Sequence, residues 1–176
     1  MNKFFDFVSF PKELVEMEYF LWLIILFFVS LTVYAIISSI YRKIKTAKEK
    51  ERIQSKIHEL VNNTLEMSPD EFFDMRQESL RYGINKLYEG VYILFNKTKN
   101  MYYVGQSKNC INRVNNHFTG KGNGDVYADF KYGDEFTIKM IALALSGYES
   151  LNALERHTIA TYDAFASGYN KTRGNW

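Results

Sequence analysis

The chain is poor in cysteine and proline. It has one cysteine, Cys110, and two prolines among 176 residues. A single thiol excludes an intramolecular disulfide and any Cys-rich metal motif, and it is typical of a protein from a reducing compartment. Because a lone cysteine in a helical stretch is usually a small packing residue, we expect Cys110 to be buried rather than catalytic.

Net charge is also scarce, and it is unevenly placed. There are 22 basic and 20 acidic residues, which leaves a formal charge of +2. Between Arg42 and Lys56 seven basic residues stand against two acidic ones, whereas residues 88–176 carry ten and eight. Tight nucleic-acid binding usually needs a strong basic surface. Residues 88–176 are therefore expected to bind nucleic acid weakly, unless a membrane or a partner raises the local concentration.

Residues 19–41 carry no charge and are almost entirely apolar. As a helix, such a run reaches roughly 34 Å, enough for a bilayer core of about 30 Å. Its apolar residues occupy every side of the helix, unlike those of an amphipathic surface helix. Tyr19, Trp22 and Tyr41 lie where interfacial aromatic belts belong. We therefore predict a transmembrane helix that contacts the lipid bilayer through residues 19–41.

Two other interpretations of this run are a cleaved signal peptide and a buried core helix. A signal peptide usually has a positively charged start, a shorter apolar core and a small-residue cleavage site. Here the start contains acidic residues and no A-x-A pattern follows. A soluble domain rarely buries so long an uncharged helix. Both alternatives are therefore disfavoured.

The charges that flank the run predict its orientation. The basic residues before the run are Lys3 and Lys12 alone, whereas the seven basic residues of segment 42–56 follow it. The positive-inside rule then places the C-terminal part in the cytoplasm and the short tail, residues 1–18, outside. The basic segment is also suited to anionic lipid head groups. The expected localisation is a single-pass protein of the cell membrane.

Residues 42–87 are interpreted as a charged helical linker. Residues 43–65 contain no glycine or proline, and their apolar residues recur at three- and four-residue spacing, which predicts a helix. Those apolar residues are Ile44, Ile53, Ile57, Leu60, Val61 and Leu65. The helix could self-associate into a homo-oligomer or form a plain solvated stalk, and both remain open. After a junction near residues 66–67, Ser68, Pro69 and Glu71 predict a capping box that begins a second helix, and Gly83 is its expected end.

From Tyr88 the residue pattern changes, and residues 88–176 are expected to form one domain. Runs of β-branched and aromatic residues at 88–95, 101–104 and 136–143 predict three strands, the first two joined by a turn at 96–100. Helical patterns cover 108–118 and 150–162, with a shorter helix at 125–132. The predicted fold class is α/β of the α+β kind: a small three-stranded antiparallel sheet flanked by helices.

Two short strings stand thirteen residues apart in this domain: Gly90-Val91-Tyr92 and Tyr103-Val104-Gly105. Arg113 follows, then Glu155 on a helical stretch, then Asn170 fifteen residues later. In this order and spacing the set resembles the catalytic signature of the GIY-YIG nuclease superfamily. The resemblance covers residues 89 to about 172, and valine replaces isoleucine in both strings.

Local stretches add to this resemblance. Residues 103–118 resemble the nuclease module of the bacterial excision-repair incision subunit. The spacing of Arg113 and His117, and that of Glu155 and Asn170, resembles phage homing endonucleases. The domain is thus identified as a GIY-YIG module, here behind an N-terminal membrane anchor.

The resemblance implies a metal-dependent enzyme that cuts phosphodiester bonds. Glu155 would hold one divalent ion, Mg²⁺ or Mn²⁺, because a single carboxylate with several waters suits magnesium. Arg113 would bind the scissile phosphate through its guanidinium group. Tyr92 would be the general base for water, which requires nearby positive charge because a phenol normally loses its proton near pH ~10. Tyr103 would hydrogen-bond the phosphate or the attacking water.

Further residues are candidates for supporting roles. His117 shares a helix face with Arg113 and would contact phosphate or relay a proton, or be a half-buried helix residue. Asn170 would fix the local backbone or contact phosphate. Gly90 and Gly105 would allow close backbone approach or tight turns. The candidates for contacts with the DNA backbone are Lys108, Asn109 and Asn112.

These patterns predict a membrane-anchored DNA endonuclease with a cytoplasmic catalytic domain. A role against phage or other incoming DNA is a hypothesis that follows from location and activity alone, and a membrane protein partner is a further expectation. One alternative is a catalytically inactive, membrane-tethered scaffold or nucleic-acid-binding protein. Another is a homing-type endonuclease of a mobile element, which would usually carry a separate DNA-reading domain.

Overall fold

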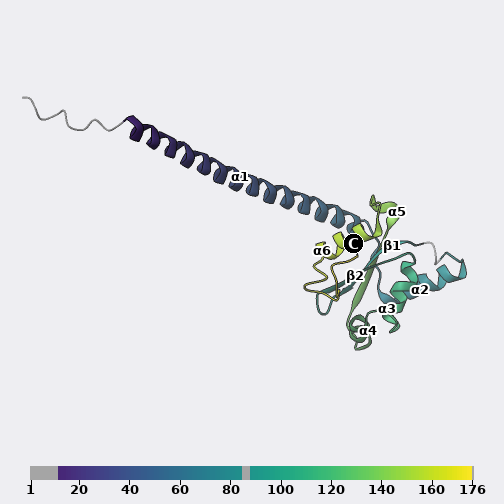
Figure 1. Ribbon diagram of the computed structural model, residues 1–176. Coiled ribbons are helices and arrows are strands. Elements are labelled where there is room, and N and C mark those ends of the chain that lie inside the picture. The colour runs from purple at the N-terminus through teal and green to yellow at the C-terminus, as the bar shows by residue number, and fades with distance from the viewer. Residues whose placement is uncertain (1–11, 85–87, 176) are drawn as a thin grey trace, which may run out of the picture. The chain divides into compact units, whose positions relative to one another are not determined.

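The computed structural model describes residues 12–84 and 88–175. Two predicted segments therefore lie partly outside it: the first eleven residues of the N-terminal tail and residues 85–87 at the end of the linker. The elements in chain order are α1 (Lys12–Asn62), α2 (Pro69–Arg81), β1 (Gly90–Asn96), β2 (Met101–Ser107), α3 (Cys110–Phe118), α4 (Gly124–Lys131), β3 (Phe136–Ala142), α5 (Leu143–Ser146) and α6 (Leu151–Thr161) (Figure 1). The chain divides into two units between Lys50 and Glu51.

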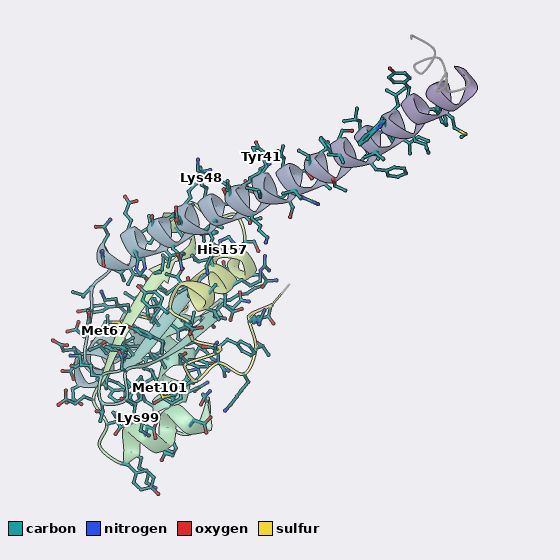
Figure 2. All side chains as sticks on the ribbon, turned by 90° about the vertical axis from the view of Figure 1, so that its left-hand side faces the viewer. Tyr41, Lys48, Met67, Lys99, Met101 and His157 are labelled. Atoms are coloured by element: carbon teal, nitrogen blue, oxygen red, sulfur yellow. The ribbon has the colours of Figure 1, made fainter. Side chains whose placement is uncertain are left out.

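The apolar run lies within α1, a helix of 51 residues. Its large apolar side chains are exposed, and they project from the helix in all directions (Figure 2). Among the described residues this is the one helix long and apolar enough to cross a membrane, and none of its apolar window is buried. A core helix of a soluble protein would be mostly buried, so the exposure argues against that alternative. A membrane anchor and a signal segment both fit.

The unit that begins at Glu51 is built on a three-stranded antiparallel sheet in the order β2-β1-β3. This confirms the predicted fold class. Strand β2 runs to Ser107, three residues beyond the expected end, because its last residues find partners on β1: Tyr92 pairs with Gly105 and Gly90 with Ser107. The glycine of the second motif therefore lies inside a strand rather than in a turn.

Alternation along the strands gives the sheet two faces, and helices cover both (Figure 1). Helices α2, α3 and α4 pack on the face that carries Tyr92 and Leu94. The other face carries Val91, Ile93 and Val104, and it packs against α6 and the end of α1. Cys110 is buried in the first of these cores, as expected of a packing residue.

The predicted linker contributes to both cores. Ile57 and Val61, in the last turns of α1, are buried against the sheet, and Phe72 of α2 is buried on the opposite face. Lys139 of β3 donates from Nζ to the Val61 carbonyl at 3.3 Å, which satisfies one of the free carbonyls at the end of α1. The apolar side chains of Ile57 and Val61 are therefore used in packing against the sheet and are not free for self-association.

The helix boundaries agree with the capping signals. Ser68 caps α2, its hydroxyl accepts from the Glu71 amide, and the Glu71 carboxylate accepts from the Ser68 amide at 2.7 Å. Helix α1 ends at Asn62, three residues before the expected residue 65. The four-residue helix α5 was not predicted, because so short a segment carries no helical periodicity.

Candidate active site

The hairpin places the two motif tyrosines side by side. Tyr92 on β1 pairs with Gly105, and Leu94 pairs with Tyr103, so Tyr92 and Tyr103 project from the same face. Their ring centroids are 6.2 Å apart. A Cβ atom on Gly105 would overlap the Tyr92 hydroxyl, so the glycine of the second string makes room for the tyrosine of the first. The convergence expected of the two phenols is thus present.

Gly90 has an equivalent role on the other side of β1. A Cβ atom there would overlap the carbonyl oxygen of Ile141 on the neighbouring strand β3. Both motif glycines allow close backbone or side-chain approach, as the sequence suggested, and neither lies in a tight turn.

The hydroxyl of Tyr92 is buried against His117. Tyr92 is 1% exposed and His117 is 0% exposed, and Tyr92 Oη lies 3.0 Å from His117 Nε2. His117 Nδ1 accepts a hydrogen bond from the Asn123 amide at 2.9 Å. Burial and the nearby Arg113 lower the pKa of His117 to about 4, so its ring is neutral at neutral pH. Its one proton then sits on Nε2 and is donated to Tyr92 Oη.

This arrangement narrows the roles open to His117. It is fully buried rather than half-buried, and both ring nitrogens are used inside the protein. Direct contact with a phosphate does not fit such a position, whereas support for Tyr92 does. Gly122 helps to keep His117 in this position, because a Cβ atom on residue 122 would lie 2.6 Å from His117 Nδ1 and push the loop that contains Gly122 away from the ring.

The two phenols differ in their surroundings. Burial and the neighbouring Tyr103 raise the pKa of Tyr92 far above its usual value, although Arg113 opposes the shift. The pKa of Tyr103 is also raised overall, chiefly by burial and in part by the Glu155 carboxylate, although Arg113 and a hydrogen bond from Tyr92 oppose the shift. Tyr103 is also the more exposed of the two. Its phenolate, unlike that of Tyr92, has a second phenol as a donor.

Arg113 and Glu155 both influence the pKa of Tyr103. Arg113 belongs to α3 on one face of the sheet, and Glu155 belongs to α6 on the other. Both act electrostatically on the Tyr103 phenol, which lies on β2, the edge strand between them. Within the described part of the chain no carboxylate forms a salt bridge with Arg113, so its guanidinium group keeps its charge available for an anionic ligand.

The carboxylate of Glu155 is held through one of its two oxygens. Glu155 is 7% exposed. Its Oε2 accepts from Gln106 Nε2 at 3.1 Å, from the Asn175 amide at 3.2 Å and from Asn175 Nδ2 at 3.4 Å. Among residues 12–84 and 88–175, no donor bonds Oε1 and no lysine or arginine pairs with the carboxylate. A buried carboxylate with one free oxygen and no cationic partner is well suited to bind a cation.

The donor set fits a hard divalent ion held mainly by water. No group of three His, Cys, Asp or Glu side chains within the described ranges could enclose a metal. Magnesium commonly keeps several waters and uses one or two carboxylates. Glu155 Oε1 matches that requirement. The same donor set does not fit zinc or another metal that needs several protein ligands.

Asn170 holds the edge strand. Its Oδ1 accepts from the Val104 amide at 2.8 Å and its Nδ2 donates to the Val104 carbonyl at 2.7 Å. The side chain therefore satisfies both backbone groups of Val104, next to Tyr103, in place of a neighbouring strand. Of the two roles expected for Asn170, fixing the backbone fits this geometry.

The three candidates for DNA contact lie at the start of α3. Lys108 is exposed just before the helix. Asn109 is the N-cap, and its Oδ1 accepts from the Asn112 amide at 3.1 Å. The Asn109 side chain is thus used within the protein, while Lys108 and the partly exposed Asn112 remain able to reach a ligand.

Three residues of the site were not predicted. Gln106 donates to Glu155 and also to Asn152 Oδ1, at 2.8 Å. Asn175 holds Glu155, and Asn123 sets the tautomer of His117. Gln106 follows the second motif directly, but nothing in the sequence shows which helix its side chain meets.

The comparison with known proteins agrees with this geometry. The GIY-YIG catalytic domain family matches residues 88–170. No curated protein and no solved structure matches the chain. The matched segment contains both motif strings, Arg113, Glu155 and Asn170, which are the residues brought together around Tyr103. Residues 88–170 of this chain are therefore a GIY-YIG catalytic domain, the phosphodiester-hydrolysing module of that nuclease family.

Proposed function

We propose that this protein is a membrane-anchored, divalent-metal-dependent endonuclease that hydrolyses DNA. The observation that carries the proposal is that Arg113 and Glu155, from opposite faces of the sheet, both lie near enough to the partly exposed phenol of Tyr103 to shift its pKa. A cationic group, a carboxylate suited to a metal and a titratable hydroxyl are the parts that phosphodiester hydrolysis requires.

In the reaction, Arg113 binds the scissile phosphate and stabilises charge as it develops. A Mg²⁺ or Mn²⁺ ion on Glu155 would neutralise charge on the phosphate and on the leaving oxygen. Tyr103, as a phenolate, accepts a proton from the attacking water while the water oxygen bonds to phosphorus and the 3′ oxygen departs. The positive charge of Arg113 favours this phenolate.

This proposal moves the role of general base from Tyr92 to Tyr103. Burial disfavours the phenolate of Tyr92, and its oxygen is enclosed against His117, where it accepts a hydrogen bond and is shielded from the attacking water. The Tyr92 hydroxyl is then free to donate to Tyr103 and to favour the Tyr103 phenolate. Tyr92 and His117 act as positioning residues, and Asn170 keeps strand β2 in place.

DNA is the proposed substrate because the domain is of a nuclease family. We propose that the sugar-phosphate backbone of the DNA binds the surface around Lys108, Asn112 and Arg113 at the start of α3. Residues 88–176 carry ten basic and eight acidic residues, so this surface alone gives modest affinity. Confinement at a membrane, or a membrane protein partner, would raise the local concentration.

The exposed apolar part of α1 supports a bilayer anchor. We propose a tail at 1–18, a transmembrane helix at 19–41, a linker at 42–87 and the nuclease domain at 88–176, with the tail outside and the linker and nuclease domain in the cytoplasm. An enzyme in this place meets DNA that enters the cell, and this supports a role against phage or other incoming DNA. Cell fractionation with protease protection tests the topology: digestion of the nuclease domain from the outer side would contradict it.

Cleavage itself is tested by nicking of supercoiled plasmid by residues 42–176 with Mg²⁺. We expect Glu155→Ala and Arg113→Ala to lose cleavage by about 10³-fold while they stay folded. If both variants cleave the plasmid as fast as the wild type, the assignment is refuted. DNA binding by the wild type with no metal-dependent cleavage would instead favour the inactive scaffold.

A further inference from the structure

Residues 171–175, which we call the strap, follow the matched catalytic domain and reach the side chain of Glu155. Their last residue supplies two of the three hydrogen bonds to the carboxylate. The Asn175 amide donates to Glu155 Oε2 at 3.2 Å, and Asn175 Nδ2 donates to the same oxygen at 3.4 Å. A segment outside the family match thus contacts the proposed metal ligand directly.

The strap is held against α6 by a backbone geometry that favours glycine. Gly174 has a φ of +96°, in the left-handed region. A Cβ atom on Gly174 would lie 2.9 Å from Arg156 Cγ and 3.3 Å from Ile159 Cδ1. Arg156 Nη1 donates to the Asn175 carbonyl at 2.6 Å. Side chains of α6 therefore fix both Gly174 and Asn175 beside Glu155.

The contacts determine which carboxylate oxygen is left available. Gln106 approaches Oε2 from strand β2, and Asn175 approaches the same oxygen from the strap. Oε2 is held from two directions, and no donor among the residues that the structure describes bonds Oε1, so Oε1 is the oxygen suited to bind a cation. Hydrogen bonds to the unused oxygen of a ligating carboxylate orient it and commonly change metal affinity by about 10- to 100-fold.

We propose that the strap is a positioning element that holds Glu155 in the orientation that binds the divalent ion, an inference that rests on the proposed function. It makes Gly174 and Asn175 determinants of metal affinity although neither binds the metal. The opposite role, in which the strap competes with the cation for Glu155 and inhibits the enzyme, predicts the reverse change.

The test uses the full chain in detergent and two readouts. Mn²⁺ affinity is measured by electron paramagnetic resonance without DNA, and plasmid nicking is measured as a function of Mg²⁺ concentration. Gly174→Val should weaken Mn²⁺ binding by about 10-fold and raise the Mg²⁺ concentration for half-maximal nicking similarly, with the KM for DNA unchanged. Gly133→Val is the matched control, because Gly133 has a φ of +98° and open space around it.

A second pair of variants avoids the strain at Gly174. Asn175→Pro removes both the backbone and the side-chain donor, and Asn175→Ala removes only the longer side-chain bond, so the loss of Mn²⁺ affinity should be larger for proline. Asn175 is exposed, and circular dichroism should show both variants folded. Unchanged Mn²⁺ affinity and Mg²⁺ dependence in all folded strap variants would overturn the inference, and so would tighter binding or faster nicking.

The Glu155→Ala variant separates this inference from the proposed function. If the wild type nicks DNA and Glu155→Ala does not, unchanged strap variants defeat the inference alone. If Glu155→Ala binds Mn²⁺ and nicks DNA like the wild type, the proposed site is wrong and the role of the strap falls with it.

Discussion

Replacing Tyr92 with phenylalanine removes one oxygen atom from the buried hydrogen-bond chain that runs through His117 to Tyr103. The Asn123 amide occupies His117 Nδ1, so the proton on Nε2 has Tyr92 Oη as its acceptor, at 3.0 Å. In Tyr92→Phe this buried N–H loses its partner, which costs about 1–3 kcal/mol. The aromatic ring stays in place, so we expect a folded variant whose Tm falls by roughly 4 °C per kcal/mol.

The same change alters catalysis through Tyr103. The hydrogen bond from Tyr92 favours the Tyr103 phenolate, so its loss raises the pKa of Tyr103. A hydrogen bond of this kind is worth about 1–1.5 kcal/mol, which corresponds to about tenfold in rate. Because the phenolate is the active form, cleavage near neutral pH should fall about tenfold, and the rising limb of the pH–rate profile should move to higher pH. Tyr103→Phe removes the base itself and should lose about 10²- to 10⁴-fold at every pH.

The assay is single-turnover plasmid nicking over a range of about four pH units, with thermal unfolding of each variant followed by circular dichroism. A Tyr92→Phe enzyme that regains activity at high pH, beside a Tyr103→Phe enzyme that does not, supports the assignment. The reasoning is refuted if Tyr103→Phe cleaves normally, or if Tyr92→Phe is inactive at every pH while it remains folded.

Three other predictions concern the residues around this chain. Burial and Arg113 lower the pKa of His117 to about 4, below the ordinary value of about 6.5 in the unfolded chain, so the unfolded state binds more protons between these pH values. The free energy of unfolding should therefore fall by on the order of 2–3 kcal/mol as the pH drops through this window. In urea titrations the stability of His117→Gln should depend less on pH than that of the wild type, and an equal pH dependence would contradict the argument. Gly105→Ala places a methyl group on the Tyr92 hydroxyl, so it should lower the free energy of unfolding by about 1–3 kcal/mol and abolish nicking. The control Gly124→Ala, whose methyl group meets nothing within 4 Å, should change neither stability nor nicking. Equal Tm values for the two variants would argue against the close contact at Gly105. Asn170→Asp keeps the acceptor for the Val104 amide but sets a carboxylate against the Val104 carbonyl. Calorimetry should therefore find Asn170→Asp less stable than Asn170→Ala at neutral pH, and its stability should recover on acidification. If Asn170→Ala is the less stable variant at neutral pH, Asn170 does not hold Val104 in this way.

Local patterns predicted most of the elements and one half of the site. The period-two alternation of the strands, together with a short turn, was enough to bring Tyr92 and Tyr103 onto one face, and the capping box at Ser68 marked the start of α2. These features depend on residues close in sequence, whose geometry follows from backbone propensities and hydrogen bonding. The resemblance to GIY-YIG nucleases then pointed to Arg113, Glu155 and Asn170.

The linker shows where local patterns were insufficient. The apolar spacing of residues 43–65 predicted a helix correctly, but it left self-association and a solvated stalk open. The structure buries Ile57 and Val61 against strands that lie far along the chain. An amphipathic helix requires an apolar partner surface, and its sequence alone does not say which surface that is.

By itself, the sequence determined the apolar helix, the antiparallel hairpin and the identities of the groups that can bind phosphate and metal. Only the tertiary structure decided that Tyr92 is buried against His117 while Tyr103 stands between Arg113 and Glu155, and that Gln106 and Asn175 hold one oxygen of the carboxylate. The reason is that burial, hydrogen bonding and charge set the proton affinity of a phenol and the orientation of a carboxylate, and here the groups responsible come from segments far apart in the chain.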